Sequence, residues 1–150
     1  VLLQHGAFVN SDDASEAPLS SAVRRADPEM TLLLLEARAA VNQRDDFGQS
    51  ALWLACRFGR RDHVNPLLQA KADLEQADEH QVSPVECCAL FAEDVEMLRE
   101  LVMLGASTSK LMSQWEELRH LAVDENPEVT EYIEALRAAK ECTKSWLEQG

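Results

Sequence analysis

Short apolar runs recur along the chain at an almost constant interval. The run LLQHGAFVN at Leu2 to Asn10 returns as LLEARAAVN at Leu34 to Asn42, as LLQAKADLE at Leu67 to Glu75 and, more weakly, as LVMLGASTS at Leu101 to Ser109. The steps between them are 32, 33 and 34 residues. An interval of this size, kept over several copies, is typical of proteins built from stacked structural repeats.

A second group of positions keeps the same interval between these runs. EAPLSSAV around Pro18, QSALWLAC around Ala51 and VSPVECCA around Pro84 follow one another at steps of 33 residues. Small residues inside these segments would let paired helices approach closely. The columns are Asp12, Asp45 and Asp78; Leu19, Leu52, Val85 and Leu118; and the small residues Ala22, Ala55 and Cys88, a column that Leu121 breaks.

Local signals place helices in the second part of each unit. Asp27 followed by Pro28, and Asn126 followed by Pro127, each offer a side-chain acceptor and then a residue whose missing N–H costs nothing at a helix start. Both pairs predict the beginning of an outer helix. The leucines from Leu32 to Leu35 recur once per unit and are expected to form core between neighbouring units.

At these residues the chain resembles the ankyrin-repeat family, whose unit combines a β-turn with two helices around T-P-L-H-x-A and a later L-L-x-x-G-A. The resemblance implies an all-α solenoid of about nine stacked helices, the first cut in half, with short β-hairpin turns and no extended sheet. It divides the chain, taken as one domain over 1–150, into a partial repeat at 1–10, full repeats at 11–42, 43–75 and 76–109, and a divergent C-terminal capping unit at 110–150.

Several residues depart from the family pattern. The position after each outer helix needs a left-handed backbone conformation, which suits Gly6 and Gly105. Arg38 and Lys71 occupy the same position in two other units, where a positive φ costs each of them about 1 kcal/mol. Pro66 falls inside an expected outer helix, so that helix is expected either to start late, with Asn65 as its cap, or to kink. In the last unit Gln114, Glu116 and Glu117 replace the glycine, threonine and proline of the pattern; its helices are expected, while its hairpin is in doubt.

Charge and composition narrow the classes of ligand. The formal net charge is −13, and it falls unevenly, with 11 acids against 8 bases over residues 1–75 and 16 against 6 over residues 76–150. Such a field disfavours nucleic acid and anionic membrane surfaces. The longest apolar stretches are too short to span a membrane, and no targeting segment is visible.

The cysteines form neither a disulfide framework nor a paired C-x-x-C motif; they are Cys56, Cys87, Cys88 and Cys142. Reduced thiols in a soluble intracellular protein, cytoplasmic or nuclear, are therefore expected. The chain starts at Val1 in the middle of a structural unit, which indicates an excerpt from a longer protein.

No catalytic or metal-binding constellation is found. Four scattered histidines, His5, His63, His80 and His120, give no metal-ligand spacing, so surface or hydrogen-bonded roles are expected. Cys87 or Cys88 could act as a nucleophile near His80, but the repeat column places Cys88 in the core. The pairs Asp12/Asp13 and Asp45/Asp46 suggest either acid and base catalysis or a turn, and the turn is favoured. We expect no enzymatic activity, no metal and no cofactor.

The family resemblance implies a protein-interaction scaffold or adaptor, monomeric by itself, that binds a partner protein through its concave surface. Two alternatives are a regulatory or substrate-recruiting part of a larger enzyme and a purely architectural spacer. Arg24, Arg44 and Arg57 could form a basic stripe that favours a partner segment rich in carboxylates. For Trp53, core packing and partner contact are both open. The predicted contact residues are Asp13, Glu16, Arg24, Arg44, Asp46, Phe47, Gln49, Trp53, Arg57, Glu79, His80 and Val82.

Overall fold

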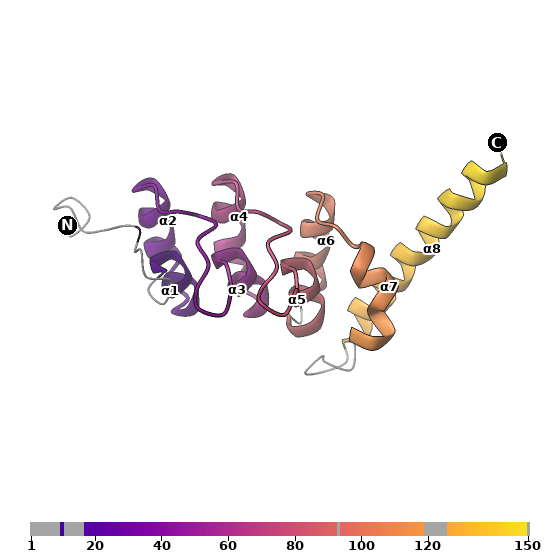
Figure 1. Cartoon of the computed structure of the whole chain (residues 1–150), viewed down its shortest axis with the longest axis horizontal. Helices are drawn as coiled ribbons and strands as arrows, with labels where there is room; N and C mark the ends of the chain where they lie inside the picture. Colours follow the sequence, from indigo (N-terminus) through magenta and orange to yellow (C-terminus); the bar gives the residue numbers. More distant parts are fainter. Residues whose placement is uncertain (1–9, 11–16, 93, 119–125, 150) are drawn as a thin grey trace.

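The computed structural model is an elongated stack of antiparallel helix pairs (Figure 1). It describes residues 10, 17–92, 94–118 and 126–149, without the side chains of 116, 118 and 139–149. In the view of Figure 1, α1, α3 and α5 form a lower row and α2, α4 and α6 an upper row, and α8 extends beyond the stack. The described helices are α1 Pro18–Arg24, α2 Pro28–Glu36, α3 Ala51–Arg57, α4 Arg61–Gln69, α5 Pro84–Phe91, α6 Val95–Met103, α7 Ser109–Leu118 and α8 Pro127–Gln149.

The predicted starts of two outer helices are confirmed. Asp27 accepts a hydrogen bond from the N–H of Met30 at 2.9 Å, and α2 begins at Pro28. Asn126 accepts from the N–H groups of Glu128 at 3.0 Å and Val129 at 3.4 Å in front of Pro127. A side-chain acceptor at this place stabilises a helix by about 1 kcal/mol. The half helix expected at 1–10 lies outside the described residues, apart from Asn10.

The small-residue column is buried as predicted. Ala22, Ala55 and Cys88 are almost inaccessible, and they lie on α1, α3 and α5, which contact one another in sequence order.

The expectation for the leucine run is wrong in part, because Leu32 and Leu33 are about half exposed while Leu34 is buried. A helix turns by about 100° per residue, so four consecutive leucines cannot all face one neighbour.

The loops that lead into α3 and α5 are tight turns built around a buried aspartate. The Oδ1 atom of Asp45 accepts hydrogen bonds from the N–H groups of Phe47 at 2.9 Å and Gln49 at 2.8 Å. Asp78 does the same for His80 at 3.0 Å and Val82 at 2.9 Å. These bonds confirm the structural interpretation of the Asp45 and Asp78 column. Asp12 lies outside the described residues.

Basic residues do occupy the left-handed position after the outer helices. Arg38 and Lys71 have φ of 63° and 66°, and Gly105 has 98°. The N–H of Arg38 bonds to the carbonyl of Leu35 at 3.0 Å, and that of Ala39 bonds to Leu34 at 2.9 Å, which is the Schellman arrangement. The turn therefore has regular Schellman geometry, with the positive φ expected at Arg38 and Lys71.

Pro66 neither delays nor divides α4, so the expectation of Asn65 as a cap is wrong. The helix begins at Arg61 and continues through Pro66 to Gln69. Tertiary packing holds the helix in place, because His63, Val64 and Leu67 are buried on one face of it. Packing of this face outweighs the loss of one backbone hydrogen bond at the proline.

The register predicted for the last unit is also wrong. The Leu118 column places an inner helix near 117, but α7 starts at Ser109, directly after the turn at Leu104 to Thr108. Its buried side chains are Leu111 and Trp115 instead. No hairpin precedes α7, as the departures from the pattern indicated, and the chain therefore enters the helix about one quarter-unit early. Leu121 lies outside the described residues.

Candidate functional site

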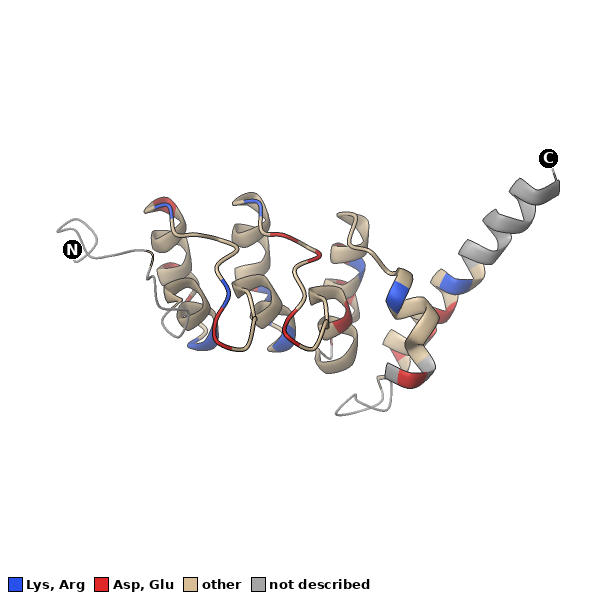
Figure 2. Ribbon diagram, viewed as in Figure 1, with Lys and Arg blue, Asp and Glu red and all other residues tan. Residues whose placement is uncertain are grey.

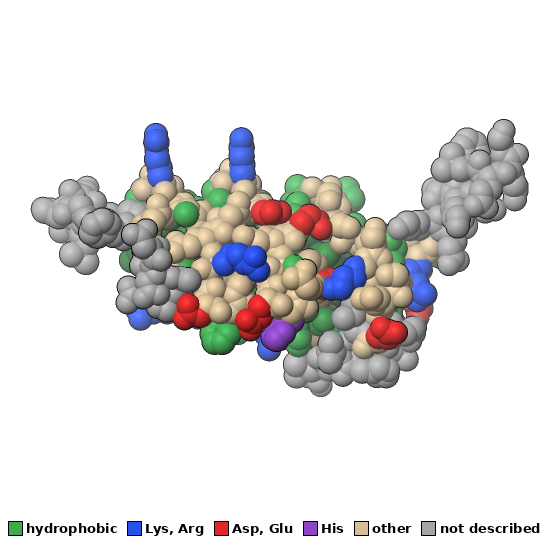
Figure 3. Space-filling view, viewed as in Figure 1, with side chains coloured by type: hydrophobic (Ala, Val, Ile, Leu, Met, Phe, Trp, Pro, Cys, Tyr) green, Lys and Arg blue, Asp and Glu red, His purple; other side chains and the backbone are tan. Residues whose placement is uncertain are grey.

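The tips of two hairpin loops place an aromatic side chain in solvent beside charged groups. Phe47 is 58% exposed, and its carbonyl accepts a hydrogen bond from the N–H of Glu79 at 3.3 Å, so the two tips are joined. Asp46, Glu79 and His80 are exposed around it. Figure 3 shows acidic, apolar and histidine side chains gathered along the lower edge, over the loops that lead into α3 and α5. We call the two tips, 45–48 and 78–81, and the adjoining ends of α1, α3 and α5 the hairpin edge.

The tips are held rigidly although their side chains are exposed. Asp45 and Asp78 are buried and bind the backbone of each loop, and Gly48 has φ of 71°. A Cβ atom at Gly48 would lie 2.9 Å from the backbone nitrogen of Glu79 and 2.8 Å from the Arg44 guanidinium. The close approach of neighbouring tips therefore requires glycine at this position.

Trp53 is a packing residue, so its assignment as a partner contact is wrong. The side chain is in the core with the residue 5% exposed, and its indole Nε1 donates a hydrogen bond to the carbonyl of Val82 at 2.9 Å. A buried indole needs an acceptor, and the next hairpin loop supplies one. Trp53 thus ties α3 to the loop that leads into α5.

The expected basic stripe of Arg24, Arg44 and Arg57 does not form, because each guanidinium contacts the next repeat. Arg24 forms an ion pair with the buried carboxylate of Asp45. Arg44 donates to the carbonyls of Gly48 at 2.9 Å and Ala77 at 2.6 Å. Arg57 lies over the ring of Phe91, 3.6 Å from its centroid. The first two arginines therefore join neighbouring repeats and are not available as a shared binding surface.

A hollow lies next to Arg57 at the ends of α3 and α5. Its volume is about 510 Å³, and it is lined by Arg57, Phe58, Gly59, Phe91, Ala92 and Asp94. Phe58 is 48% exposed. Sequence reasoning missed this feature, although Arg24 and Arg57, and likewise Phe58 and Phe91, recur at steps of 33 residues.

The other predicted contact residues separate into three groups. Asp46, Phe47, Glu79 and His80 lie exposed on the hairpin edge, where the sequence placed them. Gln49 and Val82 are half-buried at the base of the loops; the Gln49 Oε1 atom accepts from Arg24 at 3.4 Å. Asp13 and Glu16 lie outside the described residues.

Comparison with known proteins decides the family. The model "Ankyrin repeats (3 copies)" matches residues 1–78 and 19–114. The chain belongs to the ankyrin-repeat family. Ankyrin repeats are generally protein–protein interaction modules.

The similar proteins are longer ankyrin-repeat proteins with different names. Human Ankyrin repeat domain-containing protein 63 is 44% identical over 77 residues, 49% of this chain and 20% of its own length. Ankyrin repeat and KH domain-containing protein mask-1 of Caenorhabditis elegans is 26% identical over 147 residues, 93% of this chain and 6% of its length. E3 ubiquitin-protein ligase XBAT33 of Arabidopsis thaliana is 40% identical over 62 residues, 41% of this chain and 12% of its length. The chain thus spans a fifth or less of these relatives.

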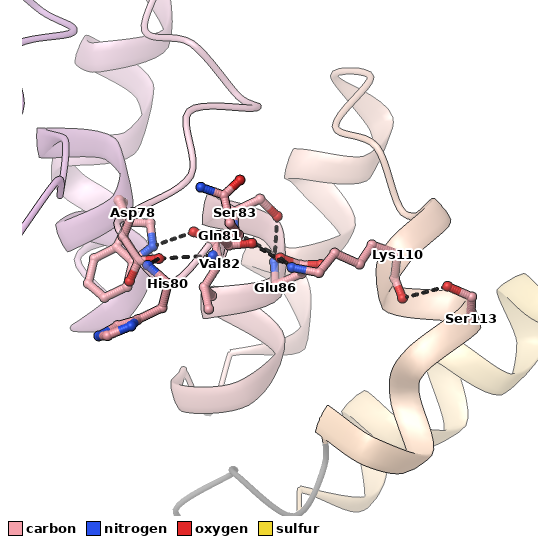
Figure 4. A network of polar contacts seen from close by, with 9 residues as sticks. Asp78, His80, Gln81, Val82, Ser83, Glu86, Lys110 and Ser113 are labelled. Atoms are coloured by element: carbon pink, nitrogen blue, oxygen red, sulfur yellow. Dashed lines mark hydrogen bonds and ion pairs between the residues drawn. The ribbon is translucent and has the colours of Figure 1, made fainter.

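A charged link joins α7 of this ankyrin stack to the hairpin before α5. The ammonium group of Lys110 on α7 contacts the carbonyl of Gln81 and lies 3.3 Å from the buried Glu86 carboxylate (Figure 4). Glu86 also accepts from the N–H of Ser83 at 2.8 Å and completes a capping box at the start of α5. Lys110 therefore fixes α7 against the last hairpin.

The buried thiols of the stack have the electrostatics of core residues. Burial, and secondarily the neighbouring thiol of Cys87, raises the pKa of Cys56. Burial also raises the pKa values of Cys87 and Cys88, and nearby Arg57 only partly opposes the effect at Cys87. A nucleophilic cysteine needs the opposite shift. The confirmed core position of Cys88 and the burial of Cys87 give the pair a packing role.

The described residues offer no arrangement of three or more His, Cys, Asp or Glu side chains suited to a metal ion. Over the same part of the chain, no helix is both long enough and apolar enough to cross a membrane. His63 is buried, and its Nδ1 lies 2.9 Å from the hydroxyl of Thr31 in the preceding helix pair, which fits the hydrogen-bonded role expected for it.

Proposed function

We propose that this chain is a non-enzymatic interaction module that binds a partner protein through the hairpin edge. The observation that carries the proposal is the exposed ring of Phe47, next in sequence to the exposed Asp46, on a hairpin tip that is joined to the tip of Glu79 and fixed by a buried aspartate. Aromatic side chains supply much of the binding energy at protein interfaces, and a rigid loop loses little entropy when it binds.

The surrounding stack supports this use of the edge. The side chains of the tips can vary while Asp45, Asp78 and Gly48 keep the backbone conformation. A solenoid presents such positions in successive units along one extended surface. The edge offers open surface, which suits a macromolecular partner better than a small molecule.

The test uses substitutions that add charge at the hairpin edge. Phe47→Arg and Gln49→Arg should weaken binding of the partner by about tenfold or more, because each inserts a cation and removes a contact at the centre of the surface. The midpoint of thermal unfolding of Phe47→Arg should change little, since its ring is mostly exposed.

A matched control is Met103→Arg, which changes another exposed apolar residue, 85% accessible, at the end of an outer helix. This variant should bind as the unchanged chain does. Equal affinity in all three variants would contradict the proposal. Lost stability in Phe47→Arg, with an effect on binding only where the chain is partly unfolded, would assign Phe47 to packing.

The alternative is that the module recruits a substrate for a larger enzyme. It is motivated by the similarity to XBAT33, which is named an E3 ubiquitin-protein ligase. The two proposals are separated by testing whether the bound partner is chemically modified in the presence of the complete protein. They share the hairpin edge as the binding surface.

A further inference from the structure

Arginines gather on the hairpin edge although the chain as a whole is acidic. Five of its 14 basic residues are arginines at positions 24, 25, 57, 60 and 61. These positions lie at the connections between α1 and α2 and between α3 and α4. The two connections have the same backbone form, with φ of 55° at Ala26 and 62° at Gly59, and they adjoin because α1 contacts α3. Figure 2 shows basic segments at the lower ends of α1 and α3.

Two of these arginines are neutralised and three are not. Arg24 pairs with Asp45, and Arg61 lies 3.3 Å from the carboxylate of Asp94. Within the part of the chain that the structure describes, Arg25, Arg57 and Arg60 form no ion pair. We call these three residues the arginine patch. The patch is a local excess of positive charge on a protein whose formal net charge is −13.

The patch adjoins a hollow lined by aromatic and polar residues, and one member of the patch contacts an aromatic ring there. The hollow of about 510 Å³ has Phe58 and Phe91 among its lining residues. The Arg57 guanidinium carbon lies over the Phe91 ring, 3.6 Å from its centroid, and this cation–π contact restrains the side chain. A guanidinium restrained in this way is suited to binding a carboxylate through two parallel hydrogen bonds.

The nearby carboxylates do not cancel the patch. Asp27 and Asp94 each cap an outer helix by accepting from a backbone N–H, at 2.9 Å and 3.0 Å. Asp94 is in addition paired with Arg61. Asp62 is exposed in the first turn of α4, so Asp27 and Asp62 are together two acids against three arginines.

We propose that the arginine patch and the hollow beside it bind an acidic segment of the partner protein, in which Asp or Glu residues flank one apolar side chain. The carboxylates pair with Arg25, Arg57 and Arg60, and the apolar side chain enters the hollow that Phe58 and Phe91 help to line. This inference rests on the proposed function, since it names the chemistry of the segment that meets the hairpin edge. The exposed carboxylates of Asp46 and Glu79 keep such a segment at the helix-end side of the edge.

A nucleic acid fits these observations less well. Its phosphates could pair with the arginines, but the protein's overall negative field repels a long polyanion. The hollow, with Phe58 and Phe91 among its lining residues, also matches an amino-acid side chain that is joined to a short acidic run. Charge complementarity at an interface acts mainly on specificity and association rate, so binding should weaken as salt is raised.

The test is selection from a displayed library of random linear peptides, with the complete chain as bait. The expected peptides are rich in Asp and Glu around one Leu, Ile or Phe. Binding of a selected synthetic peptide should fall about tenfold in Arg25→Gln/Arg60→Gln, which removes two charges and no described contact. Arg57→Gln should weaken binding separately, and its thermal midpoint shows whether the contact with Phe91 is also structural.

Arg38→Gln/Lys71→Gln is the matched control, because it removes the same charge from the ends of α2 and α4. It should leave peptide binding unchanged. Selected peptides rich in Lys and Arg, no selected peptide at all, or equal loss in the control would overturn the proposal. Peptides that lose binding in Phe47→Arg but not in the arginine variants would refute the acidic segment while leaving the hairpin edge as the binding surface. Displacement of the peptide by duplex DNA with higher affinity would point to nucleic acid.

Discussion

Trp53 allows the coupling between neighbouring repeats to be measured. Its indole N–H donates to the Val82 carbonyl at 2.9 Å, and that carbonyl also accepts from the N–H of Asp78 at 3.0 Å. The substitution Trp53→Phe keeps a six-membered aromatic ring but removes the N–H donor together with the rest of the indole. Because Val82 retains its second hydrogen bond, the loss should be close to the net value of one hydrogen bond plus a small packing defect, about 1 to 2 kcal/mol.

Trp53→Ala should be much more severe. It removes the whole side chain from a position that is 5% exposed and leaves a cavity between α3 and the next loop. Losses of about 3 to 5 kcal/mol are usual for such truncations of aromatic core residues. Phe47→Ala is the control, because its ring is mostly exposed and its loss should stay within about 0.5 kcal/mol.

Urea unfolding followed by circular dichroism measures all three variants against the unchanged chain. The predicted order of unfolding midpoints is Phe47→Ala close to the unchanged chain, then Trp53→Phe, then Trp53→Ala. A Trp53→Phe protein with an unchanged midpoint would refute the role assigned to the indole hydrogen bond. A Phe47→Ala protein that is destabilised as much as Trp53→Ala would refute the assignment of Phe47 to the surface.

Three further outcomes are expected. Burial first, and the positive charge of Arg60 next, lower the pKa of His63 from its ordinary value of 6.5. The unfolded chain therefore binds a proton more readily than the folded chain, so the free energy of unfolding falls as the pH drops below about 6.5. The midpoint of urea unfolding should therefore depend less on pH in His63→Asn than in the unchanged chain. In the control His80→Asn, which changes an exposed histidine, the midpoint should keep its full pH dependence. Lys110→Met should cost about 1 to 2 kcal/mol in urea, because it leaves the buried Glu86 carboxylate without its cation; Lys71→Met, on the surface, should cost little. Truncation after Ser109 uncovers faces of α5 and α6 that contact α7 and α8, so the truncated chain should aggregate, as measured by light scattering. A truncated chain of unchanged solubility and stability would show that residues 110–150 are an appendage.

The repeat pattern predicted the features that recur in every unit. The helix starts at Asp27 and Asn126 and the aspartates of the turns follow from local hydrogen bonding, which a short segment determines by itself. The small column at Ala55 and Cys88 follows from the need of paired helices to approach closely. Because these constraints are local or periodic, they can be recognised in one sequence.

The features that the sequence did not predict depend on contacts between distant residues. The start of α7 at Ser109 is accompanied by burial of Leu111 and Trp115 and by the link from Lys110 to Glu86. Pro66 is tolerated because neighbouring side chains of α4 are buried. The partners of Arg24 and Arg44 lie 21 to 33 residues away, so the sequence showed their charge but not that the charge is used inside the stack.

The central claim is that a partner protein binds the hairpin edge, and amide hydrogen exchange with and without the bound partner tests it most directly. The account predicts slower exchange on binding at 44–49, 57–60 and 78–82, while 37–40 and 70–73 at the ends of the outer helices exchange at unchanged rates. Protection confined to the outer-helix ends, with the loops at 44–49 and 78–82 unaffected, would contradict it.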